Sequence, residues 1–391
     1  MLEKDRRNVI AYYVFNFLIG FYLANGTTIL FERQLGLAYS QIFMLDAVYM
    51  LMFILFEVPS GAVADLLGRK KTILVGTAVL CLGALATGSA QNFFQLFLTF
   101  FIWAFGFSLI SGSSEAMLYD ALEDEKVYHR VYGRAWSCSV IGMALSGVVG
   151  PLLFEHYFRL PYLLSALPFA AAAIAIFFFN EKILTAPHPS LLNYWHQMKE
   201  GTKLAFGNRY VLWSTAALSL VFAVSYTFTS AYQPYLILVG FSVVQFSFIL
   251  PVMFVMEALG GGWSQKLTGF FGERAAFWLT FISIGLSLLV LGIYASKTVA
   301  SVLFLYSFLQ GFLRPLVSTY ANRYIDSKYR ATVVSVQGMA STITASAVLF
   351  SFGFLTDHIG IIALTTVMGV VVLVVGVLLL LFKPKQVALR G

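Results

Sequence analysis

Long apolar segments, nearly free of charged residues, run the length of this chain and decide what it can fold into. Twelve of them have the roughly 20 residues that a helix needs to cross the hydrocarbon core of a bilayer. They cover residues 8–32, 40–65, 72–90, 94–122, 134–155, 160–180, 209–236, 242–262, 275–296, 299–323, 331–355 and 359–382. Only 11% of the residues are charged, whereas soluble domains carry roughly 25%. The pattern predicts an all-α integral membrane protein with twelve transmembrane helices.

Two of the charge-free stretches, 72–114 and 210–256, are too long for a single span. Turn-forming residues divide each of them, Ala90-Gln91-Asn92 in the first and Gly240-Phe241-Ser242 in the second. Each stretch therefore supplies two helices to the count.

The basic residues fall on alternate sides of these helices. If the N-terminus is cytoplasmic, 21 of the 25 Lys and Arg residues lie inside, whereas Arg33, Arg159 and Lys297 lie outside and Arg314 lies within a span. This bias predicts a multi-pass cell-membrane protein with both termini in the cytoplasm. The net charge of +7 indicates contact with lipid head groups and not with nucleic acid, because the positive residues are scattered over short loops.

The longest polar stretch, 181–208, separates six spans from six. We therefore expect an N-terminal half over 1–180, a linker over 181–208 and a C-terminal half over 209–391. Apolar residues recur near helical spacing within the linker, which indicates either a short helix lying on the membrane surface or an irregular connection.

The two halves carry related sequences. Seven of eleven residues are identical between 134–144 and 330–340, which are 196 positions apart. Gly36 and Gln41 recur as Gly240 and Gln245, and Glu57 with Gly61 has a counterpart in Glu257 with Gly261. Parallel repeats of six helices are one known plan for a transporter, with substrate held between the repeats.

The segment after the second span, Gly61-Ala62-Val63-Ala64-Asp65-Leu66-Leu67-Gly68-Arg69-Lys70-Lys71, resembles the signature loop of the major facilitator superfamily. The resemblance implies two pseudo-symmetric six-helix halves that transport a substrate by alternating access. It also implies a conformational latch, in which Asp65 approaches the start of the eleventh helix near Arg330. Gly61, Gly68, Arg69, Lys70 and the repeat-related Arg134 complete the candidate latch set.

Two further segments, 56–61 and 111–116, resemble prokaryotic multidrug-efflux-like members of the superfamily. The end of the fifth span fits their antiporter motif only in part, since Phe154 and Glu155 replace paired glycines. The resemblance favours export.

Five charged residues stand at bilayer depth, more than three residues from the ends of the predicted spans, namely Asp46, Glu57, Glu115, Glu257 and Arg314. Each costs about 2.5–3.5 kcal/mol at the bilayer centre and therefore needs a reason. The resemblance places Glu115 and Arg314 on helices that line a central cavity. We predict that they pair in one state and that Glu115 binds a proton when the pair opens; the alternative is a permanent structural pair. The other three carboxylates are candidates for proton coupling or for helix packing.

Other polar residues in the predicted cavity helices are candidates for substrate binding or for packing between helices. They are Asn16, Asn25, Tyr226, Thr229, Tyr232, Gln233 and Gln310, together with Arg314. The 38 Phe and 20 Tyr residues suit a lipophilic or aromatic substrate.

The sequence therefore predicts a monomeric secondary transporter for a small amphipathic or drug-like molecule, with protons as the coupling ion. The alternative is an uptake or exchange carrier for an anionic metabolite held by Arg314, since Arg suits bidentate anion recognition. We expect no enzyme activity, cofactor or metal, because no Walker A, HExxH or triad pattern is present.

Overall fold

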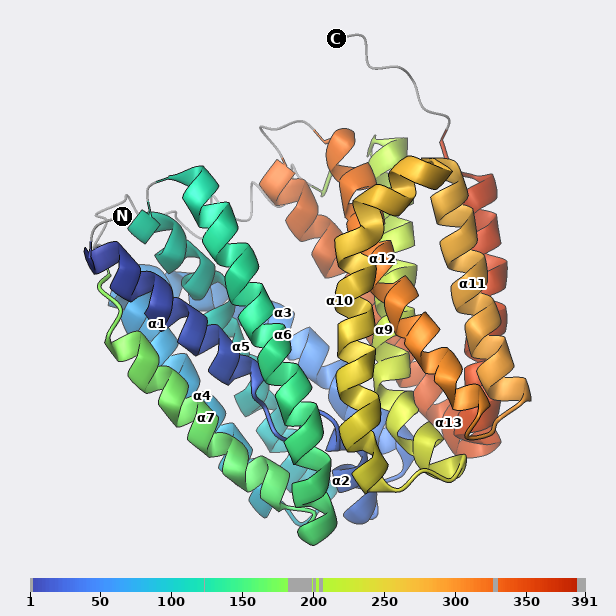
Figure 1. Cartoon of the computed structure of the whole chain (residues 1–391), viewed down its shortest axis with the longest axis horizontal. Helices are drawn as coiled ribbons and strands as arrows, with labels where there is room; N and C mark the ends of the chain where they lie inside the picture. Colours follow the sequence, from blue (N-terminus) through green and yellow to red (C-terminus); the bar gives the residue numbers. More distant parts are fainter. Residues whose placement is uncertain are drawn as a thin grey trace. The chain divides into compact units, whose positions relative to one another are not determined.

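The computed structural model describes residues 3–122, 124–181, 199, 202–203, 207–325 and 330–384. Within these residues all regular structure is helical (Figure 1). The helices are α1 (Glu3–Gly20), α2 (Thr28–Gln34), α3 (Tyr39–Leu67), α4 (Arg69–Ser89), α5 (Phe93–Leu122), α6 (Glu125–His156), α7 (Leu160–Phe177), α9 (Arg209–Leu238), η1 (Val243–Gln245), α10 (Phe246–Phe271), α11 (Glu273–Ile293), η2 (Val299–Ser301), α12 (Val302–Arg323) and α13 (Arg330–Leu381). Most of the predicted linker lies outside the described residues.

Among the described residues, ten helical segments are long and apolar enough to cross a membrane. One of them, Thr332–Leu381, contains two predicted spans, because the backbone of α13 turns at Gly360, where φ is 79°. Only glycine adopts such a φ at little cost. The segment over 8–32 is the remaining predicted span. The chain is thus an all-α, multi-pass membrane protein, as predicted.

The first span differs from its prediction. A single helix over 8–32 was expected, but the chain leaves helical geometry after Gly20 and resumes it at Thr28. A Cβ on Gly20 would lie 2.2 Å from the carbonyl oxygen of Ser139 on α6, so only glycine allows this approach. Part of the freed backbone is bonded to a neighbouring helix, because the Leu23 N–H donates to the buried Ser165 hydroxyl on α7 at 3.1 Å. Unwound backbone at membrane depth requires such protein partners.

The chain divides into two compact units. Unit 1 comprises Met1–His188 and Phe241–Phe254, and unit 2 comprises Pro189–Gly240 and Val255–Gly391. In unit 1, α4 packs against α5 and α7, while α1 packs against α6 and α7 (Figure 1). In unit 2, α13 packs against α9 and α11, and α12 packs against the same two helices.

The sequence repeat is visible in backbone geometry. Gly68 and Gly272 precede α4 and α11 with nearly the same φ and ψ, 85° and 149° against 79° and 150°. Gln41 accepts a hydrogen bond from the Ala38 N–H, and Gln245 accepts one from the Ser242 N–H, each at 3.0 Å. Each of these pairs is separated by 204 positions.

This offset corrects the predicted equivalence of Glu57 and Glu257, which are only 200 positions apart. The helical segments Tyr39–Leu67 and Val243–Phe271 are both 29 residues long and begin and end 204 positions apart. Because the helices have equal length, Glu57 corresponds to Gly261. Glu257 therefore lies about one helical turn away from the position equivalent to Glu57.

Candidate functional site

Glu257 on α10 and Arg314 on α12 form an ion pair inside the predicted spans of unit 2. The Arg314 Nη1 and Glu257 Oε1 atoms are 3.9 Å apart, and the side chains are 50% and 40% exposed respectively. This separation is too long for a hydrogen bond, which needs about 2.7–3.2 Å. The pair is therefore loose and accessible, in contrast to a tightly bonded structural bridge.

Two glycines bring α10 and α12 close enough for this pair. A Cβ on Gly311 would lie 1.9 Å from the backbone carbonyl oxygen of Glu257, and a Cβ on Gly260 would lie 1.9 Å from that of Phe308. No other residue type fits at either position without moving the helices apart. The glycines thus set the distance between the two charged side chains.

Gln310 lies one turn before Arg314 but faces the interior of unit 2. Its side chain accepts a hydrogen bond from the Ser225 hydroxyl at 2.8 Å and donates to the Tyr306 hydroxyl at 2.8 Å. Both bonds are buried, and the first joins α9 to α12. For Gln310 the structure favours the packing alternative over substrate binding.

The remaining substrate-binding candidates on α9 differ in how far their side chains are buried. Tyr232 and Gln233 are buried, whereas Tyr226 is 40% exposed and Thr229 is also exposed. The Thr229 hydroxyl donates to the Ser225 carbonyl oxygen at 2.8 Å. Tyr226 and Thr229 are thus the two candidates on this helix that present polar atoms outside the packed interior of unit 2.

On α1, the Asn16 side chain donates to the carbonyl oxygen of Tyr12 at 2.8 Å, which is a bond within its own helix. Asn25 lies in the unwound segment between α1 and α2. Both asparagines are partly exposed, and their role in substrate binding stays a prediction.

Glu115 on α5 belongs to unit 1 and lies among tyrosines. The Tyr132 hydroxyl on α6 donates to Glu115 Oε1 at 2.7 Å. The Tyr132 ring stacks on Tyr128 with centroids 5.7 Å apart, and Tyr128 meets Tyr119 edge to face at 5.1 Å. Since Arg314 belongs to unit 2, the predicted pairing of Glu115 with Arg314 stays a prediction.

Glu57 on α3 lines a 240 Å³ cavity between α3 and α5 that also reaches Arg69. The Ser60 hydroxyl donates to the Glu57 backbone carbonyl at 2.8 Å and not to its carboxylate. The Glu57 side chain is exposed and makes no hydrogen bond among the described residues.

The predicted latch loop is bonded within unit 1. The backbone N–H groups of Arg69 and Lys70 donate to Glu181 Oε1 at 2.6 and 3.2 Å. The Arg69 guanidinium pairs with Asp120 near the end of α5 and donates to the Ala116 carbonyl at 2.6 Å. Gly61 and Arg134 are exposed. The side chains of Asp65 and Arg330 lie outside the described residues, so their contact stays a prediction.

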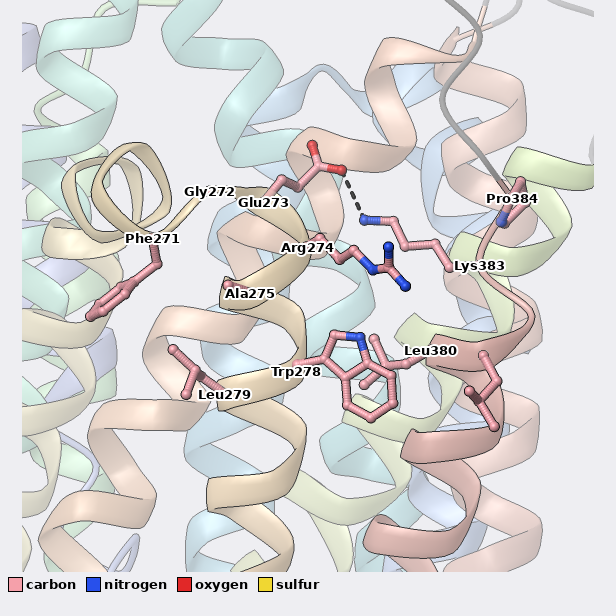
Figure 2. A pocket seen from close by; sticks show the side chains of 11 residues that line it. Phe271, Gly272, Glu273, Arg274, Ala275, Trp278, Leu279, Leu380, Lys383 and Pro384 are labelled. Carbon is pink, nitrogen blue, oxygen red and sulfur yellow. Dashed lines mark hydrogen bonds and ion pairs between the residues drawn. The ribbon is translucent and has the colours of Figure 1, made fainter.

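A larger cavity of 970 Å³ lies at one end of unit 2, between the start of α11 and the end of α13 (Figure 2). None of the predicted substrate residues lines it. Glu273 and Lys383 meet across it, with Lys383 Nζ 2.9 Å from Glu273 Oε1. The second carboxylate oxygen of Glu273 pairs with Arg323 at 2.8 Å. This cluster was not predicted from the sequence, because its three residues lie far apart along the chain.

Lys383 is enclosed by aromatic rings as well as by Glu273. Its Nζ atom lies 4.1 Å from the ring centroid of Phe277, 4.6 Å from that of Tyr320 and 5.5 Å from that of Trp213. Burial lowers the pKa of the Lys383 ammonium, and the hydrogen bond to Glu273 partly offsets this effect. The end of α13 is thus anchored to three other helices of unit 2.

One carboxylate that was not predicted to matter is Glu32 on α2. Its side chain is 1% exposed, and it interacts electrostatically with Asp46 on α3. It stood at the edge of the first predicted span, where a charge needs no explanation. The prediction missed the burial of Glu32 because it treated residues 8–32 as one helix. The break after Gly20 turns α2 inward.

A bundle of apolar helices with a few embedded charges and an unwound first span defines a class of protein, the multi-pass membrane transporter. The family model of the Major Facilitator Superfamily matches residues 9–349, and the chain belongs to this family. The resemblance predicted from the 61–71 loop is confirmed. The protein is a transporter of a small molecule and not an enzyme.

Curated relatives are consistent with this assignment. The chain is 22% identical to the MFS-type transporter YxaM of Bacillus subtilis (strain 168) over 352 residues, which is 85% of either chain. It is 29% identical to a transporter of Buchnera aphidicola subsp. Schizaphis graminum (strain Sg) over 167 residues, which is 41% of this chain and 37% of the relative.

Solved structures share the fold. A mutant form of the nucleoside transporter NupG superposes with a TM-score of 0.83 at 13% identity and covers 98% of this chain and 100% of its own. A bacterial homolog of the human lysosomal transporter Spinster gives 0.80 at 14% identity, covering 98% of each chain. A POT family transporter in complex with a thioalcohol-conjugated peptide gives 0.75 at 15% identity, covering 97% of this chain and 96% of its own. These likenesses show the major facilitator fold.

Proposed function

We propose that this protein exports amphipathic small molecules in exchange for protons. The observation that carries the proposal is the loose Glu257–Arg314 pair, 3.9 Å apart and half exposed. A charge inside a span costs about 2.5–3.5 kcal/mol, and a tight bond would offset that cost permanently. A loose pair can separate when Glu257 takes up a proton, which frees Arg314.

The surroundings of Glu115 support an amphipathic substrate. Its carboxylate accepts one hydrogen bond, from Tyr132, and remains exposed beside the rings of Tyr128 and Tyr119. Aromatic faces attract cations and lipophilic groups alike. A positively charged, aromatic molecule would therefore bind at Glu115 and compete with a proton for the same carboxylate, which is the exchange that antiport requires.

The proposal includes the orientation of the chain. We place both termini in the cytoplasm of a cell whose plasma membrane holds the protein as a monomer. The distribution of 21 of the 25 basic residues on one side supports this orientation. In this orientation Arg69 and Lys70 lie at the cytoplasmic end of unit 1.

A second candidate is uptake or exchange of an anionic metabolite. It is favoured by Arg314, whose half-exposed guanidinium is not hydrogen-bonded to Glu257 and can bind a carboxylate or phosphate. Among the structures with the same fold, NupG is a nucleoside transporter, and one POT family structure holds 5-aminolevulinic acid. Polar metabolites are therefore the alternative class of substrate.

The test uses everted membrane vesicles that respiration acidifies inside, with a pH-sensitive dye. Lipophilic cations, antibiotics and small organic anions are added one at a time. Export in exchange for protons predicts dye dequenching with amphipathic cations, and loss of this signal in Glu115→Gln and in Glu257→Gln. Glu125→Gln is the matched control, because Glu125 is a highly exposed carboxylate whose only ion-pair partner in the described part of the chain is His129.

The variants separate the two candidates. Loss of transport in Arg314→Ala with a normal response in both carboxylate variants favours the metabolite carrier. Equal, mild effects in all three variants would show that these charges are not central to transport. After either of these two outcomes, the next measurement is the entry of labelled metabolites into right-side-out vesicles.

A further inference from the structure

Glu32 is buried in unit 1 without a counter-charge. Its side chain is 1% exposed, and its Oε2 atom is buried with no hydrogen-bond partner among the described residues. An ionised carboxylate in such a place would carry a large desolvation penalty. The neutral acid, in contrast, costs only what an imperfectly bonded polar group costs.

The two arginines near Glu32, Arg33 and Arg159, make their contacts with other groups. Arg33 donates to the Leu37 carbonyl at 2.6 Å, and its guanidinium lies 4.5 Å from the ring centroid of Tyr39. Arg159 donates to the carbonyls of Gly88 and Ala90 at 2.8 and 2.6 Å. Neither forms an ion pair with Glu32, so no cation compensates this carboxylate within the described part of the chain.

The other titratable groups around Glu32 are acidic or neutral. Asp46 on α3 interacts electrostatically with it and is itself partly exposed. Tyr162 from α7 is buried beside it, the half-buried Tyr22 from the unwound segment also lies close, and Tyr49 on α3 lies near Tyr22. Two carboxylates that repel one another disfavour double ionisation, so Asp46 adds to the effect of burial in favouring the neutral form of Glu32.

We propose that Glu32 is a proton-binding site that is occupied in this conformation and exchanges its proton with the solvent through the partly exposed Asp46. The site is built by the break in the first span, which turns the short α2 helix and Glu32 inward. Broken helices place ion sites in other transporters for the same physical reason. Release leaves the Glu32 carboxylate and a free proton, and rebinding restores the acid. The link to transport rests on the proposed function, whereas the protonation itself does not.

Infrared spectroscopy of the purified full-length protein tests the protonation directly, because it detects the carbonyl stretch of a protonated carboxyl. We expect this band near neutral pH in the wild type, its absence in Glu32→Gln, and its retention in Glu155→Gln. Glu155 is the matched control, an exposed carboxylate on α6. Asp46→Asn should lose the band at a lower pH than the wild type, because removing the neighbouring negative charge eases ionisation of Glu32.

Two results would overturn the inference. One is a protonated-carboxyl signal in the wild type that Glu32→Gln leaves unchanged. The other is loss of the band on addition of Na⁺ at constant pH, which would make the site a sodium site. If Glu32→Gln does not fold, comparison of the wild type with Asp46→Asn still tests the proposal. A carboxyl band with the same pH dependence in both proteins would contradict it.

The vesicle assay separates this inference from the proposed function. If the Glu32 band is present but substrates move no protons, the proton-binding site is supported and the proposal of export in exchange for protons is rejected. If substrates move protons in the wild type but no Glu32 band is present, the export proposal is supported and the proton-binding site at Glu32 is rejected. If both hold, Glu32→Gln should abolish proton-driven transport while exchange of labelled for unlabelled substrate continues.

Discussion

Glu273 stands in unit 2 where Arg69 stands in unit 1, and the two residues make ion pairs of opposite polarity. Each is the first residue of its helix, follows a glycine of positive φ and lies 204 positions from the other. Arg69 pairs with Asp120 near the end of α5, and Glu273 pairs with Arg323 at the end of α12. A third group completes each cluster, Glu181 in unit 1 and Lys383 in unit 2.

The polarity has a physical basis. A helix N-terminus favours a negative charge, and Glu273 supplies one directly at the start of α11. Arg69 has the unfavourable sign at the start of α4, and there Glu181 accepts the N–H groups of Arg69 and Lys70 instead. In both repeats a carboxylate thus lies at the N-terminus of this helix, Glu181 from elsewhere in the chain at α4 and Glu273 from the helix itself at α11.

We expect Glu273→Gln to lower the stability of the protein by about 3 kcal/mol, because it leaves two cations near one another without their carboxylate. Thermal unfolding in detergent micelles should show a lower Tm than the wild type. Glu125→Gln removes an exposed carboxylate and should leave the Tm within about a degree, since exposed pairs contribute little. A normal Tm in Glu273→Gln would show that the cluster does not hold the end of α13.

Exchange of the whole cluster should be tolerated better than removal of one member. The triple variant Glu273→Arg, Arg323→Asp and Lys383→Glu recreates in unit 2 the charge order of unit 1. We expect its Tm to lie above that of Glu273→Arg alone, because every charge regains a partner of opposite sign. Unfolding of both variants in the same detergent measures this coupling, and equal Tm values would contradict the equivalence of the clusters.

Gly311→Ala should disrupt the Glu257–Arg314 pair. The added methyl group would lie 1.9 Å from the Glu257 carbonyl oxygen, so α10 and α12 must move apart. Overpacking of this kind costs about 1–3 kcal/mol, and transport should fall with stability. Gly262→Ala is the control, since a Cβ there meets nothing within 4 Å. The Tm and the vesicle transport activity of both variants should be measured. Equal values for Gly311→Ala and Gly262→Ala would rule out this role for Gly311.

Ser165→Ala should weaken the unwound segment of the first span. The variant removes the acceptor of the buried Leu23 N–H, and a buried donor without a partner costs about 1–3 kcal/mol. Hydrogen exchange followed by mass spectrometry should show faster exchange in residues 21–27. Ser137→Ala, which removes only an exposed hydroxyl bonded to its own helix, should leave that exchange unchanged.

The stability contributed by Lys383 should rise with pH in the alkaline range. Burial lowers its pKa in the folded protein below the ordinary value of 10.5. Between the two pKa values the unfolded chain binds a proton that the folded chain does not, so folding becomes more favourable as pH rises. The Tm difference between wild type and Lys383→Met should therefore shift in favour of the wild type as the pH rises from below the lowered pKa towards 10.5. A shift in the opposite direction would mean that Glu273 outweighs burial.

Much of the architecture could be predicted from local sequence. Hydropathy and turn residues placed most helices within a few residues of their ends, because a bilayer admits few alternatives to a helix. The glycine turns at Gly36 and Gly240 and the 61–71 loop indicated the repeat and the family. The assignment of Glu57 to Glu257 failed because two matched residue pairs, Glu57 with Glu257 and Gly61 with Gly261, do not determine the register of a helix, whereas equal helix lengths do.

By itself the sequence determined that this chain spans a membrane many times, that it is all helical, and that five of its charges stand well inside the spans. Those properties depend on composition along the chain. Only the tertiary structure decided which charges have partners: Arg314 with Glu257, Glu115 with Tyr132, and Glu32 with no cation among the described residues. The physical reason is that the partner of a charge depends on how closely helices approach, and that is set by contacts such as those of Gly20 and Gly311 with distant backbone.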